Sequence, residues 1–154
     1  MEQLFRKQQK DFSSVWSHTN ILYQKWAEHM GISYAAFMTL YGLDVRGSMT
    51  QKNICDFCGF TKQTVNGVVH DFVKQGYVSL ETGRRDRREK LVVFTEKGKA
   101  YAKKLLAPLY QAEQYVFSTI GDKKISQMID TIDAFNTLLE CSCTVKKQAT
   151  ENNR

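Results

Sequence analysis

Apolar residues recur at every third or fourth position from residue 3 to residue 30, with polar and charged residues between them. This spacing predicts one long amphipathic helix that ends at Gly31. A second helix is expected to start after Ser33, whose hydroxyl can cap it, and to stop near Gly47. The first part of the chain is therefore expected to be helical.

A short helix and a longer helix are expected next, with a tight turn between them. Thr50 opens the short helix, which runs through Cys58, and residues 59–60 form the turn. Thr61 caps the longer helix, and Gly76 ends it. Apolar residues recur along this longer helix at helical spacing: Val65, Val68, Val69, Phe72 and Val73. Of these, Val65, Val68, Val69 and Phe72 are expected to face the core.

The hydrophobic period then changes from that of a helix to that of strands. Residues 77–81 and 90–94 are predicted strands, joined by a charged loop over residues 82–89. Helix, short helix, tight turn, helix and then a hairpin with a basic tip is the order of a winged helix-turn-helix. We therefore assign residues 33–95 to a winged helix-turn-helix lobe.

Two more helices are predicted after this lobe. Thr95 caps the first, over about residues 96–117, and the lone Pro108 is expected to kink or break it. The second starts at Gly121 and continues with apolar residues at helical spacing. The polar residues 144–154 are expected to form a frayed tail.

The fold class that follows is mainly α with a small β-hairpin wing. The chain is expected to be one domain, residues 1–154, in which the helices at residues 1–31 and 96–143 form a helical dimerisation lobe beside the winged helix-turn-helix lobe. The apolar stripes of these helices are too large for so small a module to cover alone. A homodimer is therefore inferred.

Basic charge is concentrated in one part of the chain. Lys and Arg number 22 against 16 Asp and Glu, for a net charge of +6. Residues 74–104 hold ten of these basic and four of these acidic residues, so this stretch accounts for the whole excess and suggests a localised anionic partner. No apolar run approaches the ~20 residues that span a bilayer, and the N-terminus lacks a secretion signal. A cytoplasmic protein without a membrane partner is expected.

The winged helix-turn-helix pattern indicates double-stranded DNA as the anionic partner. Such a module places the start of its second helix against base edges in the major groove, and amide side chains suit the edge of adenine. Arginine at a hairpin tip suits a narrow minor groove and its phosphates. The candidate DNA-binding residues are Thr50, which opens the preceding helix, Thr61, Lys62, Gln63, Thr64, Asn66, Gly67 and His70 on the second helix, and Arg84, Arg85, Asp86, Arg87 and Arg88 at the tip.

Each of these residues also has an ordinary structural explanation. Polar side chains such as Gln63 and Asn66 can simply solvate an exposed helix face, and Gly67 can reflect close approach to DNA, tight packing or tolerance. A run of arginines can be a solvated loop, or can bind RNA or an acidic protein. The combination of charge, turn and hairpin is what favours DNA.

Four cysteines fall in two close pairs, Cys55 with Cys58 and Cys141 with Cys143. In a reducing cytoplasm free thiols are expected, and the first pair lies inside a helix, where packing is the simpler role. A zinc site that joins both pairs is disfavoured because they belong to different lobes. No metal and no cofactor are therefore expected, with a cysteine-based redox or metal sensor of the same fold as the alternative.

Aromatic residues at helical spacing suit either a core or a pocket for a small aromatic effector. They are Trp16, Trp26, Tyr34, Phe37 and Tyr41. Their spacing favours the core, and no individual effector is indicated. His18, His29 and His70 are too scattered to suggest a metal site.

Two segments resemble the MarR family of bacterial winged helix-turn-helix transcription regulators. The segment TKQTVNGVVHDFVKQGYV is similar to that family's recognition helix and the start of its wing. The segment DRREKLVVFTEKG is similar to its Asp-Arg-Arg wing and its Leu-Thr-x-x-Gly junction, with Phe94 in the Leu position and Thr95 and Gly98 matching. The order of elements agrees over residues 3 to 143.

The resemblance implies a homodimer, held by its first and last helices, that binds a pseudo-palindromic operator. It implies that Asp86 orients Arg88 into the minor groove, and that the protein represses transcription until a small ligand or an oxidant releases it. Peroxide-sensing members use a cysteine in the first helix, and this chain has none before Cys55.

An enzyme is the alternative of a different class, and the sequence disfavours it. It contains no glycine-rich phosphate loop, no His/Asp/Glu cluster at metal-ligand spacing, and no nucleophile in a recognisable setting. The one specific enzymatic hypothesis is redox turnover by Cys55 and Cys58, which requires a lowered thiol pKa. A winged helix that contacts protein or RNA is a further alternative.

Overall fold

The structure is a computed structural model that describes residues 1–83 and 89–151, with the side chains of the second range described to residue 142. The chain divides into two compact units, Met1–Ala107 and Pro108–Arg154. Over the part of the chain that the structure describes, no helix is both long and apolar enough to cross a membrane.

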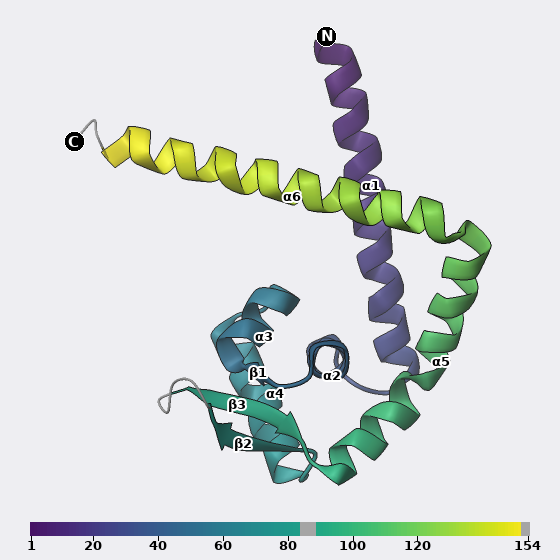
Figure 1. Cartoon of the computed structure of the whole chain (residues 1–154), viewed down its shortest axis with the longest axis vertical. Coiled ribbons are helices and arrows are strands. Elements are labelled where there is room, and N and C mark those ends of the chain that lie inside the picture. The colour runs from purple at the N-terminus through teal and green to yellow at the C-terminus, as the bar shows by residue number, and fades with distance from the viewer. Residues whose placement is uncertain (84–88, 152–154) are drawn as a thin grey trace. The chain divides into compact units, whose positions relative to one another are not determined.

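The first unit contains four helices and three strands, and it includes the start of a fifth helix (Figure 1). Its elements are α1 (Glu2–His29), α2 (Tyr34–Arg46), β1 (Met49–Thr50), α3 (Gln51–Cys58), α4 (Lys62–Lys74), β2 (Val78–Thr82), β3 (Lys90–Phe94) and α5 (Glu96–Ile120), which continues into the second unit. The second unit also contains α6 (Asp122–Glu151). The fold class is mainly α with a small β wing, as the sequence predicts.

The helix ends follow the predicted capping residues. The Ser33 hydroxyl accepts a hydrogen bond from the backbone N–H of Ala36 at 3.2 Å, which satisfies one of the free donors at the start of α2. Gly47 and Gly59 close α2 and α3 with positive φ angles of 77° and 68°. Glycine adopts these angles without the steric cost that a side chain carries, so both helices end where the sequence indicates.

The three strands form one antiparallel sheet in the order β1-β3-β2. The predicted hairpin pairs Val78 with Phe94 at its base and Thr82 with Lys90 toward its tip. The sequence did not predict β1, in which Met49 pairs with Val92. Two residues are too few to show an alternating pattern, and this strand is recognisable only through its pairing with β3.

The core of the first unit gathers side chains from α2, α3, α4 and the sheet. Fully buried residues include Phe37, Leu40, Leu43, Ile54, Val65, Val69 and Val92. The predicted inner face of α4 is confirmed for Val65, Val69 and Phe72, while Val68 is only half-buried and Val73, at the same helical spacing, is 41% exposed. Val73 lies in the last turn of α4, where helical spacing continues although the core does not.

The junction between the sheet and α5 depends on a close backbone approach. A side-chain carbon at Gly98 would collide with the carbonyl oxygen of Tyr77, so only glycine fits there. The Thr95 hydroxyl donates to the carbonyl oxygen of Gly76 at 2.7 Å and accepts from the backbone N–H of Gly98 at 3.0 Å. The Thr-x-x-Gly pattern therefore fixes the base of the wing to the first turn of α5.

Helix α5 runs without interruption through Pro108. Of the predicted kink or break, the break is wrong, and Pro108 marks the boundary between the two compact units. Proline removes one backbone donor, a loss that α5 tolerates without ending. Helix α6 has a helical backbone as far as Glu151, beyond residue 143, where the predicted helix ended.

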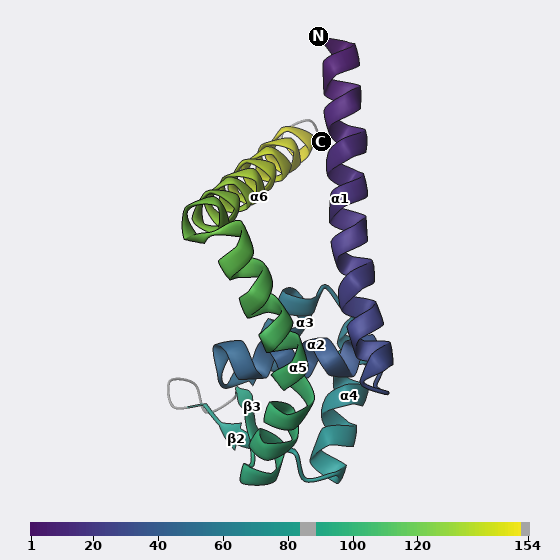
Figure 2. The same ribbon diagram turned by 90° about the vertical axis from the view of Figure 1, so that its right-hand side faces the viewer.

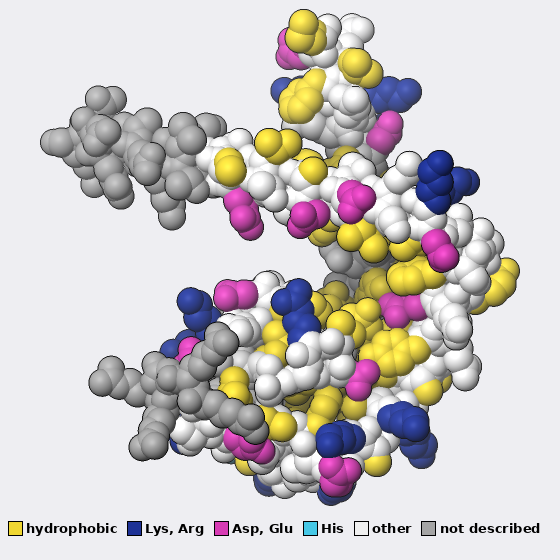
Figure 3. Space-filling view, viewed as in Figure 1, with side chains coloured by type: hydrophobic (Ala, Val, Ile, Leu, Met, Phe, Trp, Pro, Cys, Tyr) yellow, Lys and Arg dark blue, Asp and Glu magenta, His cyan; other side chains and the backbone are white. Residues whose placement is uncertain are grey.

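Many large apolar side chains on α1 and α6 remain exposed. The N-terminal part of α1 projects beyond the rest of its unit (Figure 2). The exposed residues on α1 include Leu4, Phe5, Phe12, Val15, Trp16 and Leu22, and those on α6 include Met128, Ile129, Phe135, Leu138 and Leu139. Hydrophobic side chains are visible on the surface of both helices in Figure 3. The amphipathic stripes predicted from the sequence are present, and much of their apolar surface is uncovered.

Candidate nucleic-acid interface

Helices α3 and α4 form a helix-turn-helix around Gly59. Its left-handed conformation reverses the chain, and its backbone N–H donates to the carbonyl oxygen of Cys55 at 2.8 Å. Thr61 then begins α4 by accepting a hydrogen bond from the backbone N–H of Thr64 at 3.2 Å. Both helix ends at the turn are thereby satisfied, which fixes where α4 starts.

Burial of one face of α4 leaves the predicted recognition residues on the other. Val65, Val69 and Phe72 are buried, so the positions between them are turned to solvent. Six of the candidate residues are exposed on this helix: Lys62, Gln63, Thr64, Asn66, Gly67 and His70. Gln63, Asn66, Gly67 and His70 follow the i, i+3, i+4, i+7 spacing of a single helix face. We call these four positions the α4 stripe.

The three candidate threonines form hydrogen bonds at the starts of α3 and α4. Thr50 accepts a hydrogen bond from the backbone N–H of Asn53 at 3.1 Å and so caps α3. The hydroxyls of Thr61 and Thr64 lie 2.9 Å apart and are hydrogen-bonded to each other. These side chains fix the positions of α3 and α4 in this structure.

Gly67 has no packing reason to be glycine among the residues that the structure describes. A side-chain carbon built at this position would meet nothing within 4 Å, whereas at Gly42 it would lie 2.7 Å from the Phe57 ring. The packing explanation offered by the sequence is therefore wrong for Gly67. Glycine at the centre of an exposed helix face costs about 1 kcal/mol relative to alanine, so close approach of a partner and simple tolerance are the explanations that remain.

His70 is the one member of the α4 stripe with an ion-pair partner within the described residues. Its Nδ1 lies 3.5 Å from an Asp71 carboxylate oxygen, and both side chains are more than two thirds exposed. An exposed pair of this kind contributes little to stability. The stripe is therefore not held in place by its own side-chain contacts.

The described part of the wing ends at the base of its tip. The backbone N–H of Gly83 donates to the carbonyl oxygen of Glu89 at 3.0 Å, and the Lys90 ammonium donates to the Thr82 hydroxyl at 3.2 Å. The candidate tip residues Arg84, Arg85, Asp86, Arg87 and Arg88 lie outside the described residues.

Cys58 does not have the environment of a reactive thiol. Burial, with a smaller contribution from Cys55, raises the pKa of the Cys58 thiol to about 11. This is opposite to the lowered pKa that redox turnover requires. Over the described side chains, which exclude Cys143, no three His, Cys, Asp or Glu residues are grouped as metal ligands.

No pattern in the sequence indicates the pocket that lies at the junction of α2, β1 and α3. Arg46, Ser48, Met49, Asn53, Asp56 and Phe57 line it. These residues occupy a helix end, a two-residue strand and one helix face, so they share no periodicity. A second pocket, of about 310 Å³, is lined by Leu22, Lys25, Trp26 and His29 of α1.

Comparison with known proteins identifies the family. The model of the MarR family matches residues 30–89, a range that contains α2 to β2 and ends just before β3. The structure of NMB1585, a MarR family regulator from Neisseria meningitidis, is 32% identical and has a TM-score of 0.78, with 89% of this chain and 96% of that chain covered.

Two further proteins agree at lower similarity. The uncharacterized HTH-type transcriptional regulator YwaE of Bacillus subtilis is 28% identical over 82 residues, 53% of this chain, and the match spans about half (48%) of the length of YwaE. The structure of CouR from Rhodococcus jostii, bound to p-coumaroyl-CoA, is 22% identical with a TM-score of 0.64, and covers 80% of this chain and 87% of that chain. The latter similarity supports the fold.

Proposed function

The chain belongs to the MarR family of transcriptional regulators, and from that premise we propose that it represses transcription by binding a pseudo-palindromic operator as a homodimer. The observation that carries the proposal is the α4 stripe. A buried face of valines and Phe72 turns Gln63, Asn66 and His70 outward along the second helix of a helix-turn-helix.

Some of the proposed contacts read the bases, and others position the protein on the DNA backbone. Amides at positions 63 and 66 suit the donor and acceptor pair on the major-groove edge of adenine, and Lys62 suits phosphate or guanine. Thr50 and Thr61 cap α3 and α4, and with Thr64 in the first turn of α4 they are proposed to contact phosphates near these helix starts. Arg84, Arg85, Arg87 and Arg88 are proposed to contact the minor groove and its phosphates, with Asp86 pairing with Arg88.

The homodimer is proposed from the exposed apolar faces of α1 and α6. Phe5, Phe12 and Trp16 on α1 are each about half exposed, and Leu138 on α6 is 69% exposed. Contiguous apolar surface of this kind is unfavourable in water and is typical of an interface. A second copy of the chain would cover it and place two α4 helices on one duplex.

Operator release is proposed to follow from a small aromatic ligand. In the α1 pocket, the apolar side chains of Leu22 and Trp26 lie beside Lys25 and His29, which can donate hydrogen bonds to an anion. This combination suits an aromatic acid. A ligand that binds one dimer geometry better than another shifts the spacing of the two α4 helices and so weakens operator binding. Release by an oxidant is less well supported, because the Cys58 thiol has a raised pKa.

The direct test is a titration of the purified protein with duplex DNA from immediately upstream of its own gene. A scrambled duplex of equal length is the control, and both are measured at two salt concentrations. The proposal predicts a preference for the upstream duplex that persists at the higher salt. Equal and steeply salt-sensitive binding to both duplexes would show only a basic surface, and would contradict sequence-specific recognition of this site.

A further inference from the structure

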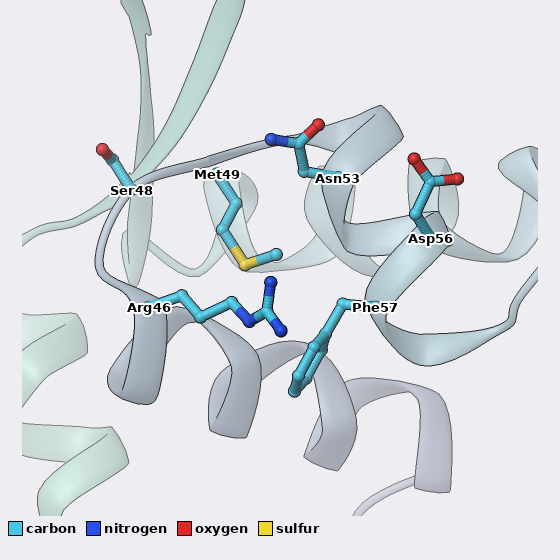
Figure 4. A pocket seen from close by; sticks show the side chains of 6 residues that line it. All are labelled: Arg46, Ser48, Met49, Asn53, Asp56 and Phe57. Carbon is cyan, nitrogen blue, oxygen red and sulfur yellow. The ribbon is translucent and has the colours of Figure 1, made fainter. Parts of the chain in front are cut away.

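The pocket between α2, β1 and α3 has the features of a ligand site that the proposed DNA contacts do not use. Its volume is about 470 Å³, within the range of small-molecule sites. Arg46 comes from the end of α2, Ser48 and Met49 from the approach to β1 and the strand itself, and Asn53, Asp56 and Phe57 from α3 (Figure 4). None of these residues belongs to the α4 stripe.

Opposite charges face the pocket without neutralising each other. Figure 4 shows Arg46 extending beneath Met49 toward Phe57, while Asp56 projects from α3. Within the residues that the structure describes, neither Arg46 nor Asp56 forms an ion pair. A cationic group and an anionic group are therefore both available to a ligand.

The Arg46 guanidinium is already oriented for binding an anion. Its central carbon lies 4.8 Å from the centre of the Phe57 ring, which is a cation–π contact. The contact places the guanidinium over the ring, and its N–H groups can donate to a carboxylate in the two-pronged geometry that arginine favours. Phe57 thus holds the donor in place and offers apolar surface to a bound ring.

The walls of the pocket are fixed by backbone contacts. The Phe57 ring packs so closely on Gly42 that a side-chain carbon there would lie 2.7 Å from it. Met49 is 4% exposed and pairs with Val92, and Asn53 donates its backbone N–H to the Thr50 cap. A pocket with fixed walls loses little conformational freedom when it binds a ligand.

We propose that this pocket binds a small aromatic zwitterion. Its anionic group pairs with Arg46, its ring lies against Met49 and Phe57, and its cationic group pairs with Asp56, with Ser48 and Asn53 as additional hydrogen-bonding groups. A benzoate with an aminomethyl group opposite its carboxylate is a simple member of this class.

The position of the pocket gives such a ligand a route to the DNA-binding elements. It contacts β1, which pairs with β3 of the wing, and α3, which precedes the turn into α4. A ligand that bridges Arg46 and Asp56 therefore stabilises one placement of the wing relative to α4. This coupling rests on the proposed function, whereas binding itself does not.

The test is calorimetric titration of the full-length protein, without DNA, with 4-(aminomethyl)benzoate as the probe. Benzoate and benzylamine, which each carry one of the two charges, are the matched ligands. The site predicts saturable binding at about 1 mM or tighter, with the probe preferred over either matched ligand by about tenfold, because each charge-assisted hydrogen bond adds to affinity.

Three variants assign the binding to the pocket. Arg46→Gln and Asp56→Asn should each abolish the preference for the probe, while Lys52→Gln, a charge change on α3 outside the pocket lining, should keep it. Circular dichroism checks that all three variants fold. Equal binding of the three ligands, no saturation, or a preference that survives in Arg46→Gln would each overturn the proposal.

A parallel DNA titration separates this outcome from failure of the proposed function. Loss of DNA binding in Arg46→Gln, with no probe binding by the wild type, would mean that Arg46 contacts a phosphate of the duplex instead, and it would overturn the ligand site. Probe binding by a protein that shows no DNA preference would support the ligand site and contradict only the proposed function.

Discussion

In the winged-helix lobe, residues 33–95, the large apolar side chains are mostly covered within one chain, whereas on α1 and α6 many of them face solvent. Phe37 and Ile54 of the lobe are at most 1% exposed, while Val15 of α1 and Leu138 of α6 are each 69% exposed. A single chain is therefore sufficient to build the lobe. The other helices require a partner to bury comparable surface.

Under the proposed function, this difference separates two tasks of a dimeric regulator. The lobe holds the α4 stripe in a fixed place by caps and packing, so its contribution to DNA recognition is local. Pairing through α1 and α6 would set the distance between two such lobes, and that distance decides which half-site spacing fits. Substitutions in the two regions should therefore differ in what they change.

The largest effect is expected from Phe37→Ala in the lobe core. Phe37 is 0% exposed and its ring contacts those of Tyr23, Tyr34 and Tyr41, so the substitution leaves a cavity and should lower the free energy of unfolding by about 4 kcal/mol. Urea unfolding measures this loss. Val45→Ala, at a 58% exposed position, is the control and should change little. Equal losses in both variants would show that the lobe does not bury its large apolar side chains within one chain.

The next largest effect is expected from charges on the α1 face. In the double variant Phe12→Glu and Trp16→Glu, the dimer should lose on the order of 3 kcal/mol, or about a hundredfold in its dissociation constant. Sedimentation equilibrium measures the change. Val73→Glu places the same charge at an exposed apolar position on α4 and should leave the dimer intact. A double variant that remains as dimeric as the wild type would place the interface elsewhere.

A smaller effect, on DNA binding rather than on assembly, is expected from Arg88→Ala. Loss of a minor-groove arginine should weaken operator binding by about 1–3 kcal/mol while the dimer stays intact. Fluorescence anisotropy with a labelled duplex gives the affinity, and sedimentation gives the oligomeric state. Unchanged affinity would reject the role proposed for this residue.

Gly67→Ala should change protein stability and operator binding in opposite directions. Because a side-chain carbon at this position meets nothing within 4 Å, alanine should raise the free energy of unfolding by about 1 kcal/mol through its helix propensity. The same methyl group should weaken operator binding if the DNA backbone approaches this face closely. Thermal unfolding and anisotropy on one sample measure both effects, and an increase in stability without loss of affinity would mean that glycine is merely tolerated.

The smallest effect concerns Cys58. Since burial and Cys55 raise the pKa of this thiol to about 11, it stays protonated in the folded protein at pH values where an unfolded thiol ionises. Its contribution to stability is therefore present at lower pH and is lost as the pH rises toward 11. At about pH 8, iodoacetamide should modify Cys58 more slowly than the exposed Cys141, as peptide mass spectrometry can show. Faster modification of Cys58 would contradict the assigned environment.

The sequence predicted most of the lobe because each of its helices carries its own local signals. Ser33, Thr50 and Thr61 cap their helices through contacts with residues three positions ahead, so they can be recognised locally. Gly59 marks the turn because it adopts the left-handed conformation that favours glycine. The α4 stripe follows from the same logic, since buried valines determine which positions face outward.

Features that depend on contacts distant in sequence were not predictable in this way. Strand β1 exists through its pairing with β3, and the pocket around Arg46 joins three elements that share no sequence pattern. The exposure of Val73 and the continuity of α5 through Pro108 likewise depend on where neighbouring elements end. Periodicity identifies a helix face and says little about how far the core extends along it.

Base reading by α4 within a homodimer can be tested by selecting preferred duplexes from a random library with the wild type and with Gln63→Ala. A two-fold symmetric motif is expected for the wild type, with half-sites about one helical turn apart, and the variant is expected to keep this spacing with altered bases within each half-site. Sequencing of the selected duplexes gives both. An asymmetric motif, or an identical motif for the two proteins, would contradict the claim that α4 reads the bases while a homodimer sets their spacing.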